Sequence, residues 1–444
     1  MATRISRANG SPTLTTKCTF SAWVKRTDSA INNSGRDCGI IETYTGANDY
    51  GWIRFDGNDQ IQIYARNSSG NLIVCDTVAK FRDPAAWYHI VATLDSTEST
   101  SSDRVKLYVN GVRQDFQGSP TYPSGEVWFN RNSATFNIGN SEKYTSNFQF
   151  DGMYSHVHFI DGLAYQASTF GETDSATGIW KINTNPTVTY GNNGFFLFKN
   201  DASLNDDSGN GNNFTLNSGS VLTTVDNPSN NFSVINSIVR TTDGTYSNGN
   251  NTFTQSQNAW HSGFGTIAME KGAGKYYIEF KGLSGTKFGF GISDFKNAGV
   301  FDRSQRGENR YVGEYANSYG YHYGGTFYYS GSSTSSGYDS FTSSNVIGMA
   351  VDMENMKIYF AKDGTWQNSS NPSSGSGGYT IVDPLNCYFP TISVEAASAS
   401  MNAGNGIFGT AAISSEGTNA SNIGKFEYDV PTGYTALSTK GLNE

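Results

Sequence analysis

Apolar and polar residues alternate along two neighbouring runs between residues 345 and 366, in the stretch NVIGMAVDMENMKIYFAKDGTW. Successive side chains of a strand point to opposite faces, so this pattern predicts a hairpin that buries one side against a second sheet. The positions predicted to share the buried face are Ile347, Met349, Val351 and Met353 on the first strand and Met356, Ile358 and Phe360 on the second. The carboxylates Asp352, Glu354 and Asp363 lie at or beside turns, where acidic side chains usually cap backbone amides.

Similar alternating runs follow one another from Phe20 to about Asp161, among them FSAWVKR, YGWIRFDGNDQIQIYAR, WYHIVATLD and DRVKLYVNGVRQDF. Asn110 and Gly111 separate two of these runs, and Asn-Gly is the strongest short-range signal for a hairpin, since a type I′ turn needs positive φ at both central residues. Short strands at this regular spacing predict an antiparallel sandwich.

The length of 444 residues exceeds the size at which one core usually keeps growing, which predicts two domains. The 50 glycines, the 16% of charged residues and the 14% of aromatic residues suit many short strands joined by tight turns. We therefore expect an all-β chain of two antiparallel, jelly-roll-like β-sandwiches. The net charge of -9 argues against nucleic-acid binding, which needs clustered Lys and Arg.

The four cysteines lie far apart and form no C-x-x-C pair, so we interpret them as free buried thiols. The first residues, MATRISRANGSPTLTTKC, lack the apolar core of a signal peptide. No run approaches the ~18 to 20 apolar residues that span a bilayer. The sequence predicts synthesis in a cytoplasm and no membrane insertion.

The order AWVKR, WYHIVATLD, VKLYVNGVRQ and FDGMYSHVHFIDGLAY resembles the laminin-G-like, concanavalin-A-like lectin fold. The stretch GFFLFKNDASLNDDSGNGNNFTLN, residues 194 to 217, resembles the corner that usually opens such domains, although here it comes last. We interpret it as a permuted closure of the same sandwich. The first domain would then cover residues 1–235.

The second half, residues 236–444, is similar to the SPRY domain. GKYYIEFK resembles its opening strand, FGFGISD its second, the hairpin described above its most characteristic element, and YFPTISVEAASASMN its closing strand. This resemblance implies a module that binds and does not catalyse.

The whole arrangement resembles structural proteins of tailed bacteriophages, particularly those of marine hosts. The segments that carry this resemblance are RISRANGSP, the long middle stretch from HVHFIDG to YGNNGFFL, and the end YDVPTGYTALSTKGLNE. It implies a virion protein made in the host cytoplasm: a tail fibre, knob or head appendage that recognises host-surface glycan or protein. The implied partners are other capsid or tail proteins in an oligomeric assembly. The alternatives are a purely structural capsid decoration that binds neighbouring subunits, and a glycan-degrading enzyme.

Retaining glycan hydrolysis needs two carboxylates ~5 to 5.5 Å apart, usually on alternate residues of one strand. The chain offers Glu279, the pair Asp352 and Glu354, and the pair Glu427 and Asp429, but none continues into an E-x-D-x-x-E run. We therefore expect no catalytic residues and no enzymatic activity.

Metal binding has two candidates in the sequence. His156 and His158 are two positions apart and would face the same way on a strand, which we interpret as a surface pair without a third ligand. The corners GANDYG, FDGND and NDDSGNGN offer oxygens that suit Ca²⁺, although such clusters are usually plain turns. No cofactor is predicted, and Ca²⁺ is assigned to no residue.

The tract YVGEYANSYGYHYGGTFYYSGSS, residues 311 to 333, is rich in tyrosine and glycine. Tyrosines among glycines form adaptable binding surfaces, but they can equally be strand residues packed into a sandwich. SPRY domains bind through loops at one end of the sandwich. We therefore predict a ligand surface at which Tyr321, His322, Tyr323 and Trp366 lie close together.

Overall fold

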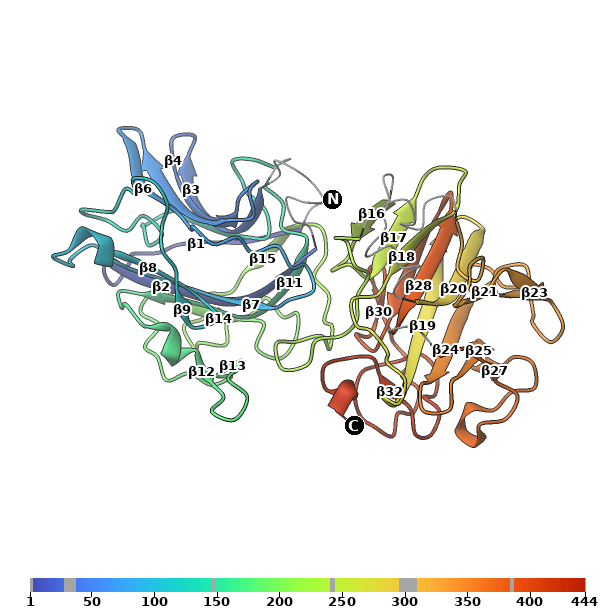
Figure 1. Cartoon of the computed structure of the whole chain (residues 1–444). Coiled ribbons are helices and arrows are strands. Elements are labelled where there is room, and N and C mark those ends of the chain that lie inside the picture. Colours follow the sequence, from blue (N-terminus) through green and yellow to red (C-terminus); the bar gives the residue numbers. More distant parts are fainter. Residues whose placement is uncertain are drawn as a thin grey trace. The chain divides into compact units, whose positions relative to one another are not determined.

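The computed structural model describes residues 3–27, 37–145, 148–239, 244–294, 310–383 and 387–443. Its strands pair antiparallel, apart from one short parallel pair at Tyr276 and Thr435, and helical structure within these ranges is limited to short 3-10 turns such as Ser101–Asp103 and Ala167–Thr169. The predicted all-β class with two β-sandwiches is confirmed. Figure 1 shows each sandwich as two layers of strands.

The chain divides into two compact units, Met1–Thr223 and Thr224–Glu444. This division precedes the boundary predicted at residue 236. The segment that follows residue 223 pairs with later parts of the second unit: the Val225 amide donates to the Asn405 carbonyl at 3.2 Å, and Ile235 forms a bridge with Gly265.

The first unit packs a seven-stranded sheet on a six-stranded one. Their inner faces enclose a core in which Phe20, Ile53 and Phe136 are buried. In spatial order, the seven-stranded sheet comprises β15 (Thr215–Ser218), β1 (Arg4–Ala8), β10 (Thr135–Ile138), β3 (Cys38–Gly46), β4 (Asp49–Phe55), β5 (Ile61–Asn67) and β6 (Gly70–Asp76). The six-stranded sheet comprises β14 (Phe195–Leu197), β11 (Gly152–Asp161), β2 (Lys17–Arg26), β7 (Tyr88–Asp95), β8 (Val105–Val109) and β9 (Val112–Arg113).

The late segment 194–217 closes this sandwich, as its sequence predicted. Strand β14 pairs with β11 in one sheet, and β15 pairs with β1 in the other. Between β11 and β14 the chain forms a separate hairpin of β12 (Gly171–Thr173) and β13 (Trp180–Ile182).

The turn between β8 and β9 has the predicted geometry. Asn110 and Gly111 both have positive φ, 49° and 78°, as a type I′ turn requires. A side chain at Gly111 would also meet the indole of Trp180 at 2.4 Å. Glycine is therefore required here both by the backbone and by the neighbouring ring.

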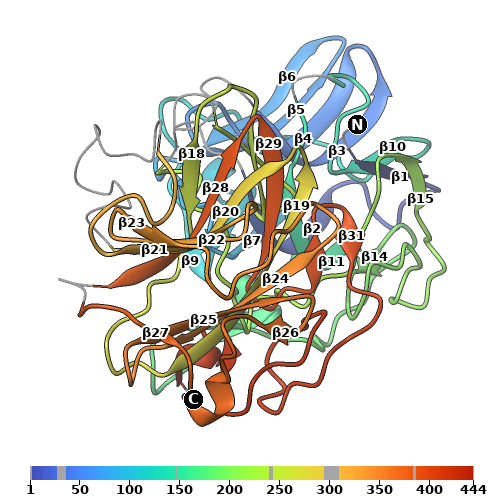
Figure 2. The ribbon, with the colours of Figure 1, turned by 90° about the vertical axis from the view of Figure 1, so that its right-hand side faces the viewer.

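The second unit is also a sandwich of two sheets, seen from another side in Figure 2. The main path of the nine-stranded sheet comprises β16 (Gly244–Ser247), β17 (Thr252–Gln255), β29 (Ala397–Asn402), β19 (Lys275–Ser284), β24 (Val346–Asp352), β25 (Lys357–Lys362) and β26 (Thr365–Trp366). Two short strands complete it: β27 (Tyr379–Thr380) pairs with β25, and β32 (Thr435–Ala436) pairs with β19. The six-stranded sheet comprises β18 (His261–Phe264), β28 (Tyr388–Glu395), β20 (Lys287–Asp294), β21 (Ser318–His322), β22 (Thr326–Tyr329) and β23 (Ser332–Thr334). A small hairpin of β30 (Ile407–Phe408) and β31 (Ala411–Ala412) lies apart from both sheets.

The predicted hairpin of residues 345–366 is formed by β24 and β25. Ile347, Met349 and Val351 lie in the core of the second unit with Ile358 and Phe360 of the returning strand. The four cysteines are buried thiols that form no disulfide, as expected. No helix within the described residues is long and apolar enough to cross a membrane.

Candidate functional site

Tyr321 of the predicted ligand surface is a core residue. It lies on β21 opposite Phe290 and Phe327 of the neighbouring strands, and its exposed fraction is 0%. Its hydroxyl donates to the carbonyl of Asp339. The alternation that marks β21 as a strand turns Tyr321 inward, which corrects the expectation that it contacts a ligand.

His322 points to the opposite face of the same strand and is also buried. Its Nε2 lies 2.8 Å from the carbonyl oxygen of Val312, so Nε2 carries a proton and donates it. Burial lowers the pKa of His322 to about 4, which keeps the ring neutral. A side chain at Gly289 would meet this ring at 2.7 Å, so the imidazole fills the space above a glycine of β20.

Trp366 lies in the other sheet. It pairs with Ala361 of β25, and its ring centre is 6.3 Å from that of Tyr277 on β19. Tyr323 is half-buried, with its ring centre 6.5 Å from that of Trp260. The four predicted residues therefore do not form one surface, because the strands that carry them belong to different sheets and their side chains point to different faces.

The carboxylates of the β24–β25 corner support the backbone, as the sequence predicted. Asp352 accepts hydrogen bonds from the amides of Glu354 at 3.1 Å and Asn355 at 2.8 Å. Lys275 lies 3.1 Å from Asp352 and 3.4 Å from Glu354. These hydrogen bonds and ion pairs give Asp352 and Glu354 a structural role, so their position at the corner needs no substrate to explain it.

Glu279 has a similar structural role but is completely buried. Its carboxylate accepts hydrogen bonds from the amides of Glu427 at 2.9 Å and Tyr428 at 2.8 Å, and from the side chain of Asn402 at 3.1 Å. Burial raises the pKa of Glu279 to about 7, while the two amide donors act in the opposite direction. Glu279 thus holds the C-terminal segment against β19.

His156 and His158 are not a surface pair, because a bulge separates them. The register between β11 and β2 shifts between Ser155 and His158, and His156 has a φ of 50°. His158 is buried, its ring is stacked on Phe196 at 3.9 Å, and its Nδ1 lies 2.9 Å from the hydroxyl of Tyr190. The expectation that this pair lies at the surface is wrong.

The acidic corners have the bonding of ordinary turns. Asp56 accepts from the amides of Asn58 at 2.9 Å and Gln60 at 2.8 Å, and Asp206 accepts from the amide of Asn212 at 2.9 Å. In the described part of the chain, no group of three or more His, Cys, Asp or Glu residues could hold a metal ion.

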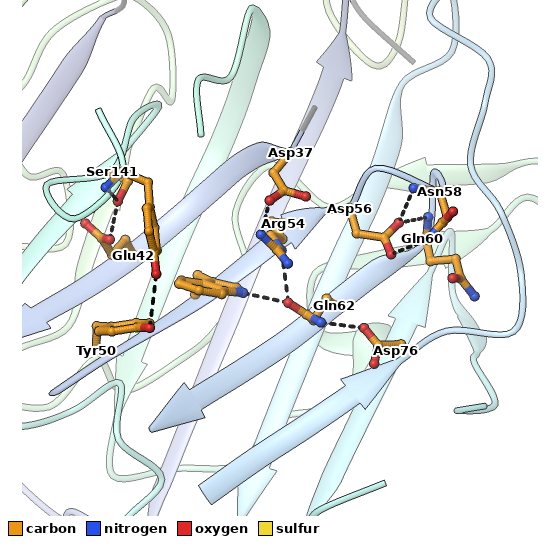
Figure 3. Close-up of polar contacts among 12 residues, drawn as sticks. Asp37, Glu42, Tyr50, Arg54, Asp56, Asn58, Gln60, Gln62, Asp76 and Ser141 are labelled. Atoms are coloured by element: carbon orange, nitrogen blue, oxygen red, sulfur yellow. Dashed lines mark hydrogen bonds and ion pairs between the residues drawn. The ribbon is translucent and has the colours of Figure 1, made fainter. Parts of the chain in front are cut away.

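A fixed row of polar side chains crosses β4, β5 and β6 on the outer face of the seven-stranded sheet (Figure 3). Gln62 accepts from Trp52 Nε1 at 2.8 Å and from Arg54 Nε at 2.9 Å, and its amide nitrogen donates to Asp76 at 2.6 Å. Arg54 also bonds to Asp37. Since the indole and guanidinium nitrogens can only donate, these bonds fix which end of the Gln62 amide faces Asp76.

The aromatic side chains beside this polar row are stacked on one another. The ring centre of Trp52 lies 5.0 Å from that of Tyr50 and 4.7 Å from that of Tyr64, and the two tyrosine rings are 6.1 Å apart. Tyr144 packs edge-on against Trp52 and is 42% exposed. Tyr50 and Trp52 are buried, whereas Tyr64 is half-buried, so Tyr64 and Tyr144 offer aromatic surface next to the polar row.

Glu42 anchors the loop that covers Tyr50 and Trp52. Its buried carboxylate accepts from the hydroxyl of Ser141, from the amide of Glu142 at 2.6 Å and from the side chain of Asn137 at 3.1 Å. Burial raises the pKa of Glu42, and the hydrogen bonds act in the opposite direction. The loop therefore limits the accessible part of this sheet face to the polar row and its aromatic neighbours.

The charges along the row are partly compensated. The side chain of Arg54 is 16% exposed and that of its partner Asp37 is 28% exposed. Burial lowers the pKa of Arg54 and raises that of Asp37, and each is opposed by the charge of the other. Asp56 and Asp76 also act on Arg54, so carboxylates outnumber the cation around it.

The sequence signal for this site lies in YGWIRFDGNDQIQIYAR, which was interpreted only as a pair of strands. Its alternation places Tyr50, Trp52 and Arg54 on the outer face of β4 and Gln62 and Tyr64 on the same face of β5. Which of these side chains bond to one another depends on the register between the strands, which the sequence alone does not reveal.

Two domain families match the chain in the predicted order. Residues 3–167 match the concanavalin A-like lectin/glucanases superfamily, and residues 275–406 match the SPRY domain. The chain therefore carries a concanavalin A-like domain followed by a SPRY domain. The segment 194–217, which supplies β14 and β15, lies beyond the first match.

Among solved structures, the SPRY domain of human HERC1 is 15% identical, covers 36% of this chain and 91% of its own, and has a TM-score of 0.28. The heptameric SAP-like pentraxin from Limulus polyphemus is 12% identical, covers 36% of this chain and 69% of its own, and has a TM-score of 0.26. No curated protein matches the chain.

Proposed function

We propose that this chain is a non-catalytic recognition protein whose first unit binds neutral carbohydrate on the outer face of the seven-stranded sheet. The observation that carries the proposal is the fixed row Arg54–Gln62–Asp76, which offers donors and a carboxylate in one line across three strands. A sugar hydroxyl both donates and accepts, so it suits a row in which donors and acceptors are held side by side.

Two further features support a carbohydrate ligand. Tyr64 and Tyr144 lie beside the row, and an aromatic ring brings contact area to an apolar sugar face at small entropic cost. The row is already ordered by its own hydrogen bonds, so a ligand would not have to order it. The match to a family of lectins and glucanases is consistent with this ligand class.

The charge around the row favours neutral sugars over acidic ones. On the row itself, Asp37, Asp56 and Asp76 surround Arg54, whose charge is already paired with Asp37, whereas Arg66 and Lys143 lie beside the aromatic rings. A ligand carboxylate placed on the row would be repelled by Asp76 and would find Arg54 already paired. Neutral oligosaccharides are therefore expected to bind more tightly than sialylated or uronic-acid oligosaccharides.

Substitution of Asp76 by Asn tests this site. The change keeps the shape of the side chain but removes a charged acceptor, so we expect at least about tenfold weaker binding of a neutral oligosaccharide, measured by calorimetry after a glycan array has identified one. The matched control is Asp103→Asn, which breaks the exposed pair of Asp103 and Arg113, 3.0 Å apart, at the edge of the other sheet of the same unit.

Equal affinity of Asp76→Asn and the unchanged chain would contradict the proposed site, and an array without any retained glycan would contradict carbohydrate binding. Release of reducing sugar from the bound glycan would contradict the non-catalytic role.

A place on the surface of a tailed-phage virion remains part of the proposal and rests on the sequence resemblance described above. The bound sugar would then belong to the host surface. Imaging of intact virions labelled with antibody to this chain tests the location. Labelling of the virion together with the absence of glycan binding would instead favour the alternative role of a capsid decoration protein.

A further inference from the structure

A second face of the first unit is covered by its own chain. Residues 162–193, here called the flap, run between β11 and β14 and include the β12–β13 hairpin. The flap lies on the outer face of the six-stranded sheet, where Thr19 Oγ1 donates to the Leu163 carbonyl at 2.9 Å and Thr93 Oγ1 donates to the Tyr165 carbonyl at 2.5 Å.

His89 of β7 connects the sheet to the flap. The indole nitrogen of Trp180 lies 2.9 Å from His89 Nδ1 and can only donate, so Nδ1 is unprotonated. The proton of the neutral ring is therefore on Nε2, which lies 2.9 Å from Ser21 Oγ and donates to it. This tautomer cannot act as a base toward Ser21, so the pair is not a nucleophile and its base.

While the flap is closed, a second proton on the His89 ring would be buried and would find no acceptor. It is 1% exposed and stacked on Trp23 at 4.8 Å, with the ring of Trp180 at 6.0 Å. A proton on Nδ1 would face the N–H of Trp180, so one hydrogen bond would be replaced by the contact of two donors in a buried place.

Two more histidines lie near His89. His158 bonds through Nδ1 to the hydroxyl of Tyr190 in the flap, and His156 bonds through Nδ1 to Ser155 at 2.8 Å. Burial lowers the pKa of His89 to about 3 and that of His156 to about 4, and it lowers that of His158 as well.

The charges near these rings oppose protonation. The other histidines and Lys199 each lower the pKa of the rings they face, and the buried Lys25 projects from the same face of β2 as Trp23. The acidic residues of the flap hairpin are engaged elsewhere, since Glu172 and Asp174 lie 3.1 Å and 3.5 Å from Lys181.

We propose that the flap is an acid-labile clasp: protonation of His89 removes the Trp180 hydrogen bond, releases residues 162–193 and uncovers the apolar sheet face around Trp23, Trp87 and Met153. These three residues form a buried cluster that Trp180 and Ile182 of the flap cover. The clasp would convert a drop in pH into exposure of a hydrophobic surface.

The difference between the pKa of His89 in the closed and in the open form determines how strongly acid favours opening of the flap. A histidine that regains its ordinary pKa of ~6.5 when the flap opens favours the open form by about thirtyfold at pH 5, because the closed form binds almost no proton there. His156 and His158 add to this factor wherever opening also exposes them.

Hydrogen exchange of the full chain at pH 7.5 and pH 5 tests the clasp. After correction for intrinsic exchange rates, amides of residues 171–182 should lose protection by at least about tenfold at pH 5. Amides of β5, in the seven-stranded sheet of the same unit, serve as the internal control. The variant His89→Asn keeps an acceptor for Trp180 but does not titrate, so it should lack the thirtyfold contribution of His89 and lose little protection at pH 5.

A second variant, Trp180→Phe, keeps the ring but removes the donor, and it should exchange faster already at pH 7.5 and respond less to acid. Equal protection of the flap at both pH values in the unchanged chain would overturn the proposal. A full acid response in both variants would overturn it as well, because the response would then not pass through His89 and Trp180.

Discussion

Tyr321 connects two layers of the second unit's core. Its ring centre lies 4.9 Å from that of Phe341 and 5.7 Å from that of Phe360, which belongs to the opposite sheet. Its hydroxyl reaches the carbonyl of Asp339 at the edge of this core. One side chain thus supplies both packing between the sheets and a partner for a backbone group.

The stability of the second unit should respond differently to two changes at Tyr321. Tyr321→Ala removes a buried ring and should lower the free energy of unfolding by about 3–5 kcal/mol. Tyr321→Phe removes only the hydroxyl and should cost about 1 kcal/mol. Urea denaturation followed by circular dichroism measures both, and Tyr323→Ala, at a half-buried position, is the control. A loss of less than 1 kcal/mol for Tyr321→Ala would contradict the core assignment.

At the scale of elements, Glu279 makes β19 the anchor of the C-terminal segment. Its ordinary pKa of 4.5 is raised to about 7 in the folded chain, so the folded state holds this proton more tightly than the unfolded state. The unfolded state therefore binds fewer protons between these values, and stability falls as the pH rises through this window. The hydroxyl of Tyr277 also donates to the carboxyl group of Glu279, at 3.3 Å.

The second unit should accordingly be more stable at pH 5 than at pH 8, by up to about 3 kcal/mol at 1.36 kcal/mol per pKa unit. Urea-dependent hydrogen exchange of β19 and β24 measures this difference. Glu279→Gln should abolish the pH dependence and cost about 1–3 kcal/mol at pH 5, since its amide group would face backbone or Asn402 donors. An unchanged pH dependence in this variant would show that another group is responsible.

Strand alternation made the strands predictable, but not which of the candidate binding side chains would be exposed. The β24–β25 hairpin and the turn at Asn110 follow from local pattern and backbone chemistry alone. Tyr321 was misplaced because tyrosine suits both a loop surface and a core strand, and the pairing partners that decide between them are distant in sequence. The bulge at His156 is likewise invisible in the alternation, since one extra residue reverses the faces that follow it.

At the scale of the whole molecule, each unit has its own core and its own pair of sheets. The core of the first unit contains residues between Ile5 and Phe214, and that of the second contains residues between Ile235 and Leu437. A unit with a complete core is expected to fold alone. The family matches lie one in each unit.

Fragments 1–223 and 224–444 should therefore each fold when expressed separately. Each should give a cooperative thermal transition in calorimetry, and dispersed amide signals in NMR spectra are the second measurement. The control is a second pair of fragments in which the chain is divided at residue 194. The first fragment of this pair lacks β14 and β15 and should not fold. If the 1–223 fragment does not fold while the 224–444 fragment does, the first unit needs residues beyond 223.

The late closure of the first unit has a consequence for its synthesis. Strand β1 lies between β10 and β15 and is synthesised before both, so it receives its second neighbour only after residue 218 has emerged. Until then one edge of β1 presents unpaired backbone groups to other nascent chains on the same messenger. A pause in translation before residue 215 would prolong this interval, whereas a pause after 223 would allow the first unit to close before the second begins to fold.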